Sequence, residues 1–285
     1  MQTATTQDLS PSYWDQVLRE RARVPRLDAW REYMCRVYTD LMDRWLPFAR
    51  HGRGLKTDLF EEAVSEHILL PAMGQCSVGI DCSLAIALAA KRRLEAYEGA
   101  SFLIVGDLRR LPIRSSALEY VLSGSSLDHF QHHDQIALCL AELHRVLVPG
   151  APAIFAFDNP HNPVVWLRNR LPFVWLNRAG LVPYYVGATY TREMALRQLE
   201  AAGFEVLEAT AVAHAPRAVV IGIVALFERL GWNRPLSAIR HLLEVFEKLQ
   251  YLPTRYRTGY YIAFNVKKVG RANSPHESAT GGSIR

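Results

Sequence analysis

The chain has 285 residues, 49% of them hydrophobic and 21% charged, which is typical of a globular protein with a substantial buried core. Its formal net charge is +5, but the basic residues are spread along the sequence, which argues against a concentrated nucleic-acid-binding face. The four cysteines form no C-x-x-C pair, so we expect neither a zinc site nor a disulfide framework, and the reducing cytoplasm, with a peripheral membrane contact as an alternative, is the expected location. The N-terminus has no basic segment followed by an apolar one, so we expect no signal peptide.

The N-terminal region has the pattern of a helical cover. Between Pro11 and Phe48 the apolar side chains recur at helical spacing, which predicts two amphipathic helices broken near Pro25. The rest of the chain reads as one α/β domain with an aromatic-rich and a helical insertion, followed by a Gly/Ser/Asn-rich disordered tail. The expected parts are the cover 1–50, the domain 51–269 with insertions at 160–190 and 216–256, and the tail 270–285.

Within the α/β domain, short apolar runs alternate with helical patterns, which favours a parallel sheet with right-handed crossovers. Strands are expected at Gly54–Leu59, Cys76–Ile80, Phe102–Val105, Tyr120–Ser123, Ala153–Phe157, Phe204–Val212 and Gly259–Val266. Helices are expected at Glu61–Leu70, Leu84–Tyr97, Gln135–Leu147, Arg192–Ala202, Val219–Leu230 and Ser237–Leu249.

Acidic residues follow two consecutive strands of this pattern. Asp81 comes directly after one strand and Asp107 shortly after the next. Ligands of open parallel sheets bind at the carboxyl edge of the strands, where both acids would lie. A carboxylate at Asp81 could accept hydrogen bonds from both hydroxyls of a ribose; alternatively, Asp81 caps the helix that begins near Ser83, and Asp107 is an ordinary loop acid.

Five consecutive segments carry a family resemblance: SVGIDCS, FLIVGDLRRLPI, YVLSGSSLDHF, ELHRVLVPG and APAIFAFDNP. Their succession resembles class I S-adenosylmethionine-dependent methyltransferases, particularly those acting on small molecules and lipids. The resemblance covers residues 54–157 well. The later elements, up to Val266, match the family only in their topology. The resemblance implies a Rossmann-like α/β fold, with a mostly parallel seven-stranded sheet and helices on both faces. It also implies S-adenosylmethionine as donor and S-adenosylhomocysteine as product.

The resemblance also implies which residues bind the nucleoside of the donor. Asp81, with Cys82 beside it, would hold the ribose. Asp107 and Leu108 would hold the adenine.

The segment after the fourth strand would hold the reacting end of the donor. Ser123 and Gly124 would flank the sulfonium, because small side chains let donor and acceptor approach each other. His129 is a candidate general base for a hydroxyl acceptor, with a purely structural role as the alternative. Because His132 and His133 have no further carboxylate or cysteine ligand at helical spacing, we expect no metal there, and we expect Asp134 to cap the helix at Gln135.

The family's glycine-rich loop after the first strand is missing. Its pattern is an acidic residue followed by G-x-G-x-G, whereas this chain reads LKTDLFEEA without a glycine after Gly54. Side chains there would keep the backbone away from the donor. In compensation, Lys56 could pair with the donor carboxylate, Asp58 with its ammonium, and Thr57 could add a hydroxyl. Alternatively, these residues only end a strand and cap a helix in a protein that no longer binds the donor.

The aromatic-rich insertion is expected to cover the acceptor. The candidate acceptor-binding residues are Tyr13, Trp45, Asp158, Trp166, Tyr184 and Tyr185. The insertion's aromatic side chains would line an apolar pocket, or face a membrane surface with arginines towards the headgroups as a peripheral contact. The alternative is packing against the sheet, which must account for some of them. The apolar run at 219–227 is shorter than the ~20 residues needed to span a bilayer.

The expected reaction is direct methyl transfer to an O, N or C nucleophile of a hydrophobic small molecule or lipid. The first alternative is a non-catalytic binding or scaffold protein that keeps the fold. A nicotinamide oxidoreductase is disfavoured because no G-x-G-x-x-G follows the first strand. An RNA methyltransferase is disfavoured because no contiguous basic stretch is evident.

Overall fold

The computed structural model describes residues 10–21, 28–48, 51–74, 76–97, 101–124, 126–179, 182, 184–231 and 234–270. Its centre is a seven-stranded sheet with the order β3-β2-β1-β4-β5-β7-β6. The strands are β1 (Gly54–Lys56), β2 (Val78–Asp81), β3 (Phe102–Val105), β4 (Tyr120–Gly124), β5 (Pro152–Asp158), β6 (Phe204–Val212) and β7 (Tyr261–Lys268). Strands β1 to β5 are parallel and β7 runs antiparallel between β5 and β6. This is the class I methyltransferase fold, as predicted.

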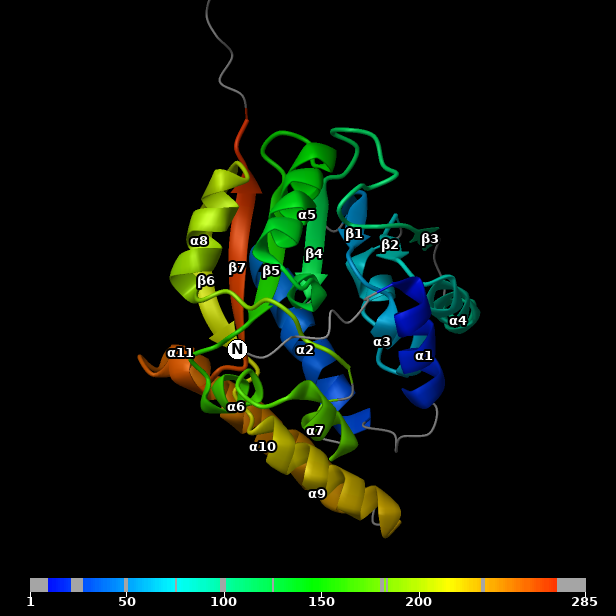
Figure 1. Cartoon of the computed structure of the whole chain (residues 1–285), viewed down its shortest axis with the longest axis vertical. Helices are drawn as coiled ribbons and strands as arrows, with labels where there is room; N and C mark the ends of the chain where they lie inside the picture. Colours follow the sequence, from blue (N-terminus) through cyan, green and yellow to red (C-terminus); the bar gives the residue numbers. More distant parts are fainter. Residues whose placement is uncertain are drawn as a thin grey trace, which may run out of the picture.

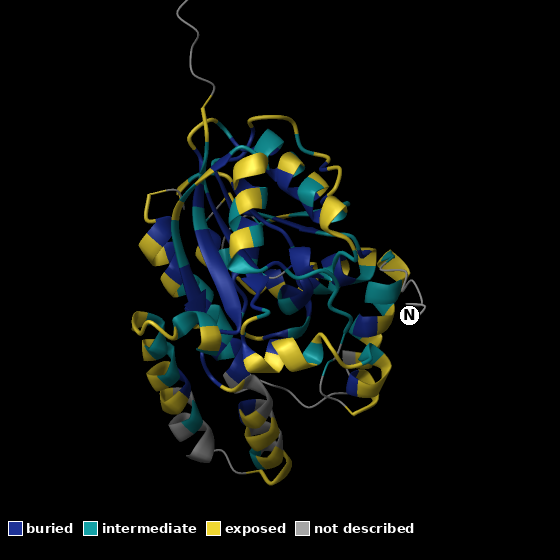
Figure 2. Ribbon diagram, turned by 60° about the vertical axis from the view of Figure 1, so that its left-hand side comes forward, coloured by how far each residue is buried: buried dark blue, intermediate teal, exposed yellow. Residues whose placement is uncertain are grey.

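Helices cover both faces of the sheet (Figures 1 and 2). They are α1 (Pro11–Arg21), α2 (Asp28–Trp45), α3 (Phe60–Val64), α4 (Leu84–Leu94), α5 (His133–Val146), α6 (Pro163–Arg168), α7 (Phe173–Arg178), α8 (Arg192–Ala201), α9 (Arg217–Arg229), α10 (Arg234–Glu247) and α11 (Arg255–Thr258). One apolar core packs α5 and α8 on the sheet. The other packs α1 to α4 with parts of α9 and α10.

The N-terminal helices pack on helices that follow the strands of the sheet. The Ser83 hydroxyl, at the N-cap of α4, donates to the Asp15 carboxylate of α1 at 2.5 Å. Helix α2 packs near α9 and α10. Helix α1 thus contacts α4, and α2 contacts α9 and α10, while residues 22–27 between the two N-terminal helices lie outside the described part of the chain.

The segment after β1 differs most from the expected secondary structure. β1 ends at Lys56 rather than Leu59, and α3 ends at Val64 rather than Leu70. Helix α3 cannot continue because Ser65 is extended. The Arg93 guanidinium of α4 then binds the carbonyls of Ala63 (3.0 Å) and Ser65 (3.1 Å). These side-chain contacts with a distant helix are not encoded in local periodicity.

The expected cap of α5 is also wrong. The helix begins at His133, and its N-cap is His132 rather than Asp134. The Gln135 side chain accepts a hydrogen bond from the His132 N–H at 3.3 Å, which satisfies a backbone donor at the helix start. At the end of α5 the expected Pro-Gly turn is present, with Gly150 at φ +78°.

The two insertions form helical additions at one end of the molecule (Figure 1). The first contains α6 and α7, and the second contains α9, α10 and α11. None of the helices in the described ranges combines the length and hydrophobicity needed to cross a membrane. The expected disordered tail beyond Gly270 lies outside the described residues.

Candidate active site

A cavity of about 980 Å³ lies at the carboxyl edge of the sheet. It crosses the tips of β3, β2, β1 and β4, which are neighbours in that order, and includes the point between β1 and β4 where the strand order reverses. Many predicted site residues line it, namely Thr57, Asp58, Asp81, Cys82, Asp107, Leu108, Gly124, His129 and Tyr184. An extended ligand could therefore touch all four strand tips at once.

Asp81 at the tip of β2 is a buried carboxylate held by two backbone donors. Its oxygens accept hydrogen bonds from the N–H groups of Ser83 (2.9 Å) and Leu59 (3.1 Å). Burial raises the pKa of Asp81 to about 6, although both hydrogen bonds act against the rise. Because each carboxylate oxygen can accept a second hydrogen bond, Asp81 can anchor both strand ends and still face a ribose. Burial also raises the pKa of the neighbouring Cys82 to about 12, so its thiol is neutral.

Asp107 at the tip of β3 is paired with Arg109. The Arg109 Nη2 lies 2.6 Å from one carboxylate oxygen and its Nε lies 3.0 Å from the other. Burial raises the pKa of Asp107, but the hydrogen bonds from Arg109 lower it more, so the group stays ionised. An adenine amino group bound here would share Asp107 with Arg109.

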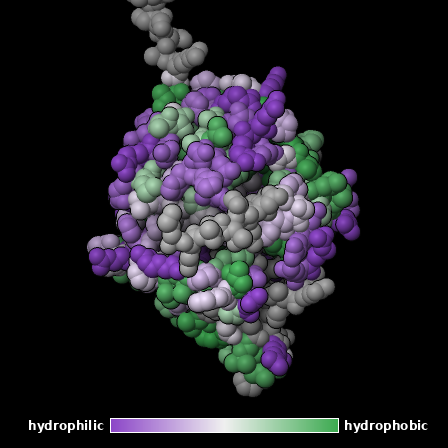
Figure 3. Space-filling view, in the orientation of Figure 1, coloured by the Kyte–Doolittle hydropathy of each residue, from purple (hydrophilic) through white to green (hydrophobic). Residues whose placement is uncertain are grey.

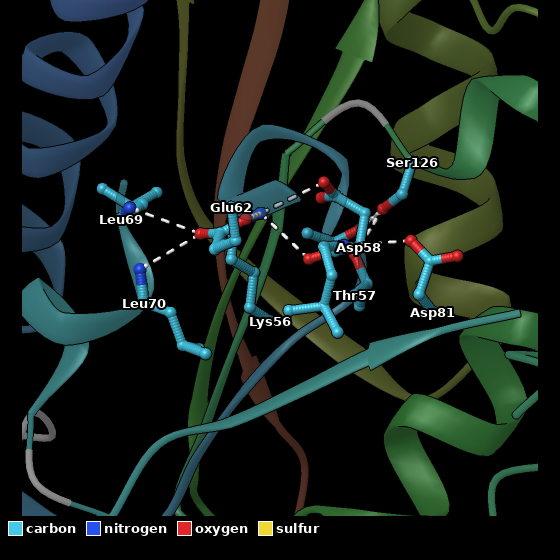
Figure 4. Close-up of polar contacts among 10 residues, drawn as sticks. Lys56, Thr57, Asp58, Glu62, Leu69, Leu70, Asp81 and Ser126 are labelled. Atoms are coloured by element: carbon cyan, nitrogen blue, oxygen red, sulfur yellow. Dashed lines mark hydrogen bonds and ion pairs between the residues drawn. The ribbon is translucent and has the colours of Figure 1, made fainter. Parts of the chain in front are cut away.

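A buried ion cluster replaces the glycine-rich loop after β1 (Figure 4). The Lys56 ammonium lies 2.9 Å from the Glu62 carboxylate and 3.1 Å from that of Asp58, and it also donates to the Asp58 carbonyl at 3.0 Å. The other Glu62 oxygen accepts the N–H groups of Leu69 (3.3 Å) and Leu70 (3.2 Å). Desolvation alone would lower the pKa of Lys56, but the two carboxylates raise it. Lys56 is not among the described residues that line the cavity, so its expected contact with the donor carboxylate has no support here.

Three hydroxyls join the tips of β1 and β4. The Thr57 hydroxyl donates to the Ser123 hydroxyl at 3.0 Å and also contacts that of Ser126. Thr57 and Ser126 line the cavity, while Ser123 is fully buried behind them. Ser123 therefore supports the wall of the cavity from behind.

His129 presents a neutral imidazole to the cavity. Its Nδ1 lies 3.1 Å from the carbonyl oxygen of Tyr185. That oxygen can only accept, so Nδ1 carries the proton and Nε2 keeps its lone pair. Burial lowers the pKa of His129. No hydrogen bond to Nε2 is found within the described residues, so the geometry fits a proton acceptor.

Aromatic rings surround this imidazole. The His129 ring centroid is 4.9 Å from that of Trp14 and 5.2 Å from that of Tyr184. Phe60 contacts both Trp14 (6.3 Å) and Tyr184 (5.8 Å). We call Trp14, Phe60, His129 and Tyr184 the aromatic wall; all four line the cavity, and they make this end of it largely apolar.

Helix α2 contributes site residues that sequence patterns did not indicate. Trp30, Met34 and Tyr38 line the cavity, and their i, i+4, i+8 spacing is the signal that could have found them. A Cβ on Gly124 would lie 3.0 Å from the Tyr38 ring. Gly124, which was predicted to flank the sulfonium, thus leaves space for the Tyr38 ring of α2.

Arg31 is a further unpredicted site residue from α2. Its guanidinium is buried, lines the cavity and lies 3.2 Å from the Glu61 carboxylate. Of the lysines and arginines in the described residues, Arg31 and Arg109 are the ones that line the cavity. Arg109 is paired with Asp107 at the β3 end, whereas Arg31 is paired with Glu61 of α3.

Five expected acceptor-binding residues lie elsewhere. Trp45 donates its indole N–H to Glu208 (2.9 Å), and Asp158 is buried in an ion pair with Arg168 (2.5 Å). The Trp166 side chain is 48% exposed, and the Arg170 guanidinium lies over its ring. Tyr13 and Tyr185 stand behind the cavity, where the Tyr185 N–H donates to the Tyr13 hydroxyl at 2.7 Å. The last two residues position the aromatic wall from outside.

The imidazole of His133, near the start of α5, has contacts of its own. The His133 ring stacks on Tyr190 with centroids 4.7 Å apart, and its Nε2 lies 3.2 Å from the Thr189 carbonyl. Among the described residues no group of three or more His, Cys, Asp or Glu side chains could hold a metal ion.

Comparison with known proteins agrees with this fold. The model of a family described as Methyltransferase domain matches residues 65–150, less than a third of the chain. A search of curated proteins gave no match. Among solved structures, a Thermotoga maritima protein described as a possible histamine N-methyltransferase is similar over 90% of this chain and 93% of its own, with 14% identity and a TM-score of 0.54.

Two further structures show how broad this similarity is. An S-adenosylmethionine-dependent methyltransferase from Mesorhizobium loti is 13% identical over 80% of this chain and 96% of its own, with a TM-score of 0.53. The [4+2]-cyclase SpnF is 18% identical over 82% of this chain and 80% of its own, with a TM-score of 0.51. Likeness at these identities establishes the fold, and a fold hosts more than one chemistry. The matched family implies S-adenosylmethionine as methyl donor.

Proposed function

We propose that this chain transfers a methyl group from S-adenosylmethionine to an O, N or C nucleophile of a hydrophobic small molecule or lipid. One observation carries the proposal: a single cavity has strand-end acids at one end and the aromatic wall with a neutral imidazole at the other. The first end suits a polar nucleoside, and the second suits an apolar acceptor that must lose a proton. The donor, when bound, supplies an electrophilic methyl group on sulfur.

The order of the strand tips sets the orientation of the donor. We assign the adenine to Asp107 and Leu108 at β3 and the ribose to Asp81 at β2. The amino-acid end then falls at Thr57 and Asp58 on β1. This direction points the sulfonium towards β4, where Gly124 offers no side chain.

We assign the donor carboxylate to Arg31 instead of Lys56. Arg31 lines the cavity beside Glu61, whereas Lys56 is already held by Glu62 and Asp58. Asp58 keeps its proposed contact with the donor ammonium, because it lines the cavity and its position is fixed by Lys56. Charge-assisted contacts of this kind would replace the backbone contacts of a glycine-rich loop.

His129 is assigned as the base that accepts the acceptor's proton at Nε2. The Tyr185 carbonyl fixes its tautomer, and the rings of Trp14 and Tyr184 surround the imidazole with apolar groups. Aligning the two reactants in one cavity can lower the barrier by roughly 7–11 kcal/mol, so the main task of the other residues is positioning.

Calorimetric titration with S-adenosylhomocysteine tests the proposal directly. We expect binding by the wild type and a large loss of affinity in Asp81→Ala. Asp134→Ala is the matched control, because Asp134 is an exposed acid outside the cavity. Mass spectrometry of small molecules that co-purify with the untagged protein would then identify the acceptor class.

The rival function is a binding or scaffold protein that has lost the donor. Its support is specific: residues 55–63 contain no glycine, and Phe60 and Glu61 line the cavity. Absence of heat with S-adenosylhomocysteine, together with an intact fold by circular dichroism, would establish this rival.

The division of the chain is part of the proposal. We keep residues 1–50 as a cover that completes the cavity, 51–269 as the catalytic domain and 270–285 as a tail. We also keep a cytoplasmic location, with no nucleic-acid partner.

A further inference from the structure

Helices α6 and α7 present an unusually apolar surface to solvent. Six large apolar side chains there are between 38% and 67% exposed, and Trp175 is the most exposed of them. They are Val164, Trp166, Leu167, Leu171, Val174 and Trp175, which we call the α6–α7 face. A dense cluster of this kind marks an interaction surface more often than scattered apolar residues do.

The charged residues between the ends of this segment are basic. No acidic residue occurs between Asp158 and Glu193, whereas Arg168, Arg170, Arg178 and Arg192 all fall in that interval. Arg168 forms a buried ion pair with Asp158, but Arg170 and Arg178 are exposed. The Arg170 guanidinium lies 3.7 Å from the Trp166 ring centroid. Exposed tryptophans flanked by exposed arginines that have no carboxylate partner among the described residues complement an anionic headgroup layer.

A second apolar stripe lies at the same end of the molecule. In α9 and directly after it, the side chains of Val219, Ile223, Leu226 and Leu230 are 40–57% exposed, and their spacing puts them on one helix face. Figures 1 and 2 both show the α9–α10 hairpin projecting from the end where α6 and α7 lie. Figure 3 shows hydrophobic side chains gathered at this lower end.

The α6–α7 face is joined to the acceptor end of the cavity. Phe173, in the same helix as Trp175, packs its ring on Tyr185 with centroids 5.6 Å apart. The Tyr185 carbonyl holds His129, and the adjacent Tyr184 belongs to the aromatic wall. The surface that projects apolar side chains outward is thus the outer side of the segment that closes the cavity.

We infer that the α6–α7 face docks on the surface of an anionic bilayer and that the acceptor is an amphiphile resident in that bilayer. The second half of this inference rests on the methyl transfer proposed above, whereas the docking does not. Docking would bring the acceptor to the cavity end that holds the aromatic wall, without any helix crossing the membrane. Salt would weaken the interaction, because part of it is electrostatic.

Vesicle co-sedimentation of the full chain tests the docking. We expect binding to phosphatidylcholine vesicles that contain phosphatidylglycerol, weaker binding to phosphatidylcholine alone, and release by salt. Val174→Ser/Trp175→Ala and Arg170→Gln/Arg178→Gln should each reduce the bound fraction about tenfold. Leu138→Ser is the matched control, since Leu138 is 55% exposed on α5, and it should bind like the wild type.

Two results would overturn the docking inference. One is equal sedimentation of the wild type and both face variants. The other is concentration-dependent dimerisation that the Val174→Ser/Trp175→Ala variant abolishes, because the face would then bind a second copy. Unchanged S-adenosylhomocysteine affinity in the variants shows that they fold. Vesicle binding without any S-adenosylhomocysteine binding would reject methyl transfer and leave the docking intact.

Discussion

The Lys56 ammonium lies 2.9 Å from the Glu62 carboxylate, and both side chains are buried beneath the loop that follows β1. The same ammonium holds the backbone carbonyl and the carboxylate of Asp58 at the cavity wall. The opposite oxygen of Glu62 binds the N–H groups of Leu69 and Leu70. One buried ion pair therefore connects the cavity wall to the chain that enters β2.

Lys56→Met should destabilise the protein strongly. It leaves the Glu62 carboxylate buried without a counter-ion, a change that typically costs about 3–5 kcal/mol. Chemical denaturation measures the loss. Removing both charges, in Lys56→Met/Glu62→Gln, should be less destabilising than the sum of the single changes, because the remaining amide can still accept the Leu69 and Leu70 donors. Additive losses would show that the two charges do not depend on each other.

Arg31→Met should weaken S-adenosylhomocysteine binding by about tenfold or more, the usual scale of one lost charge-assisted contact. The expected cause is the loss of the partner for the amino-acid carboxylate. Isothermal titration measures it. Arg36→Met is the matched control on the same helix, because Arg36 is half-exposed and pairs with Glu32 and Glu244. Equal affinities in the two variants would remove Arg31 from the donor site.

Donor affinity should depend on pH through Asp81. Burial raises the pKa of this group from its ordinary 3.8 to about 6, so below that pH the carboxylate becomes a neutral acid and a poorer acceptor for ribose hydroxyls. The affinity for S-adenosylhomocysteine should therefore fall as pH decreases through this value. Titrations across this pH range test it, and the Asp81→Asn variant should lack this dependence.

The stability of the ligand-free protein should change in the opposite direction. The folded state binds the Asp81 proton more tightly than the unfolded chain does. The free energy of unfolding therefore loses this contribution as pH rises from the ordinary pKa to the raised one. Opposite pH trends for binding and for stability would identify Asp81 as their common source.

The strand-end motifs were predictable because they are local. An acid directly after an apolar strand lies at the carboxyl edge whatever packs around it, so Asp81, Asp107 and Gly124 were found from sequence and line the cavity. The alternation of strand and helix also predicted parallel strands, which β1 to β5 are, whereas the antiparallel β7 does not follow from that alternation.

The contribution of the cover was less predictable. Tyr13 and Trp14 are adjacent, and only the packing of α1 decides which of them faces the cavity. Trp45 fits the helical pattern of α2, but its indole N–H is bound by Glu208 from β6. Lys56 was expected at the donor carboxylate as compensation for the missing glycine-rich loop, and nothing in the local sequence marks Glu62 as its partner. In the folded chain the buried Glu62 carboxylate forms an ion pair with the Lys56 ammonium.

His129→Gln should lower the turnover number while leaving S-adenosylhomocysteine affinity unchanged. Loss of a positioned general base usually costs about 10²–10⁴-fold in rate, and His129 has no assigned contact with the donor. Burial lowers the pKa of His129, so the acid limb of the rate profile should lie below the pH expected for an ordinary imidazole. His133→Gln is the control, because that ring is exposed and stacks on Tyr190 outside the cavity. If His129→Gln turned over as fast as the control, the imidazole would only support the aromatic wall, and the acceptor would have to lose its proton to another group.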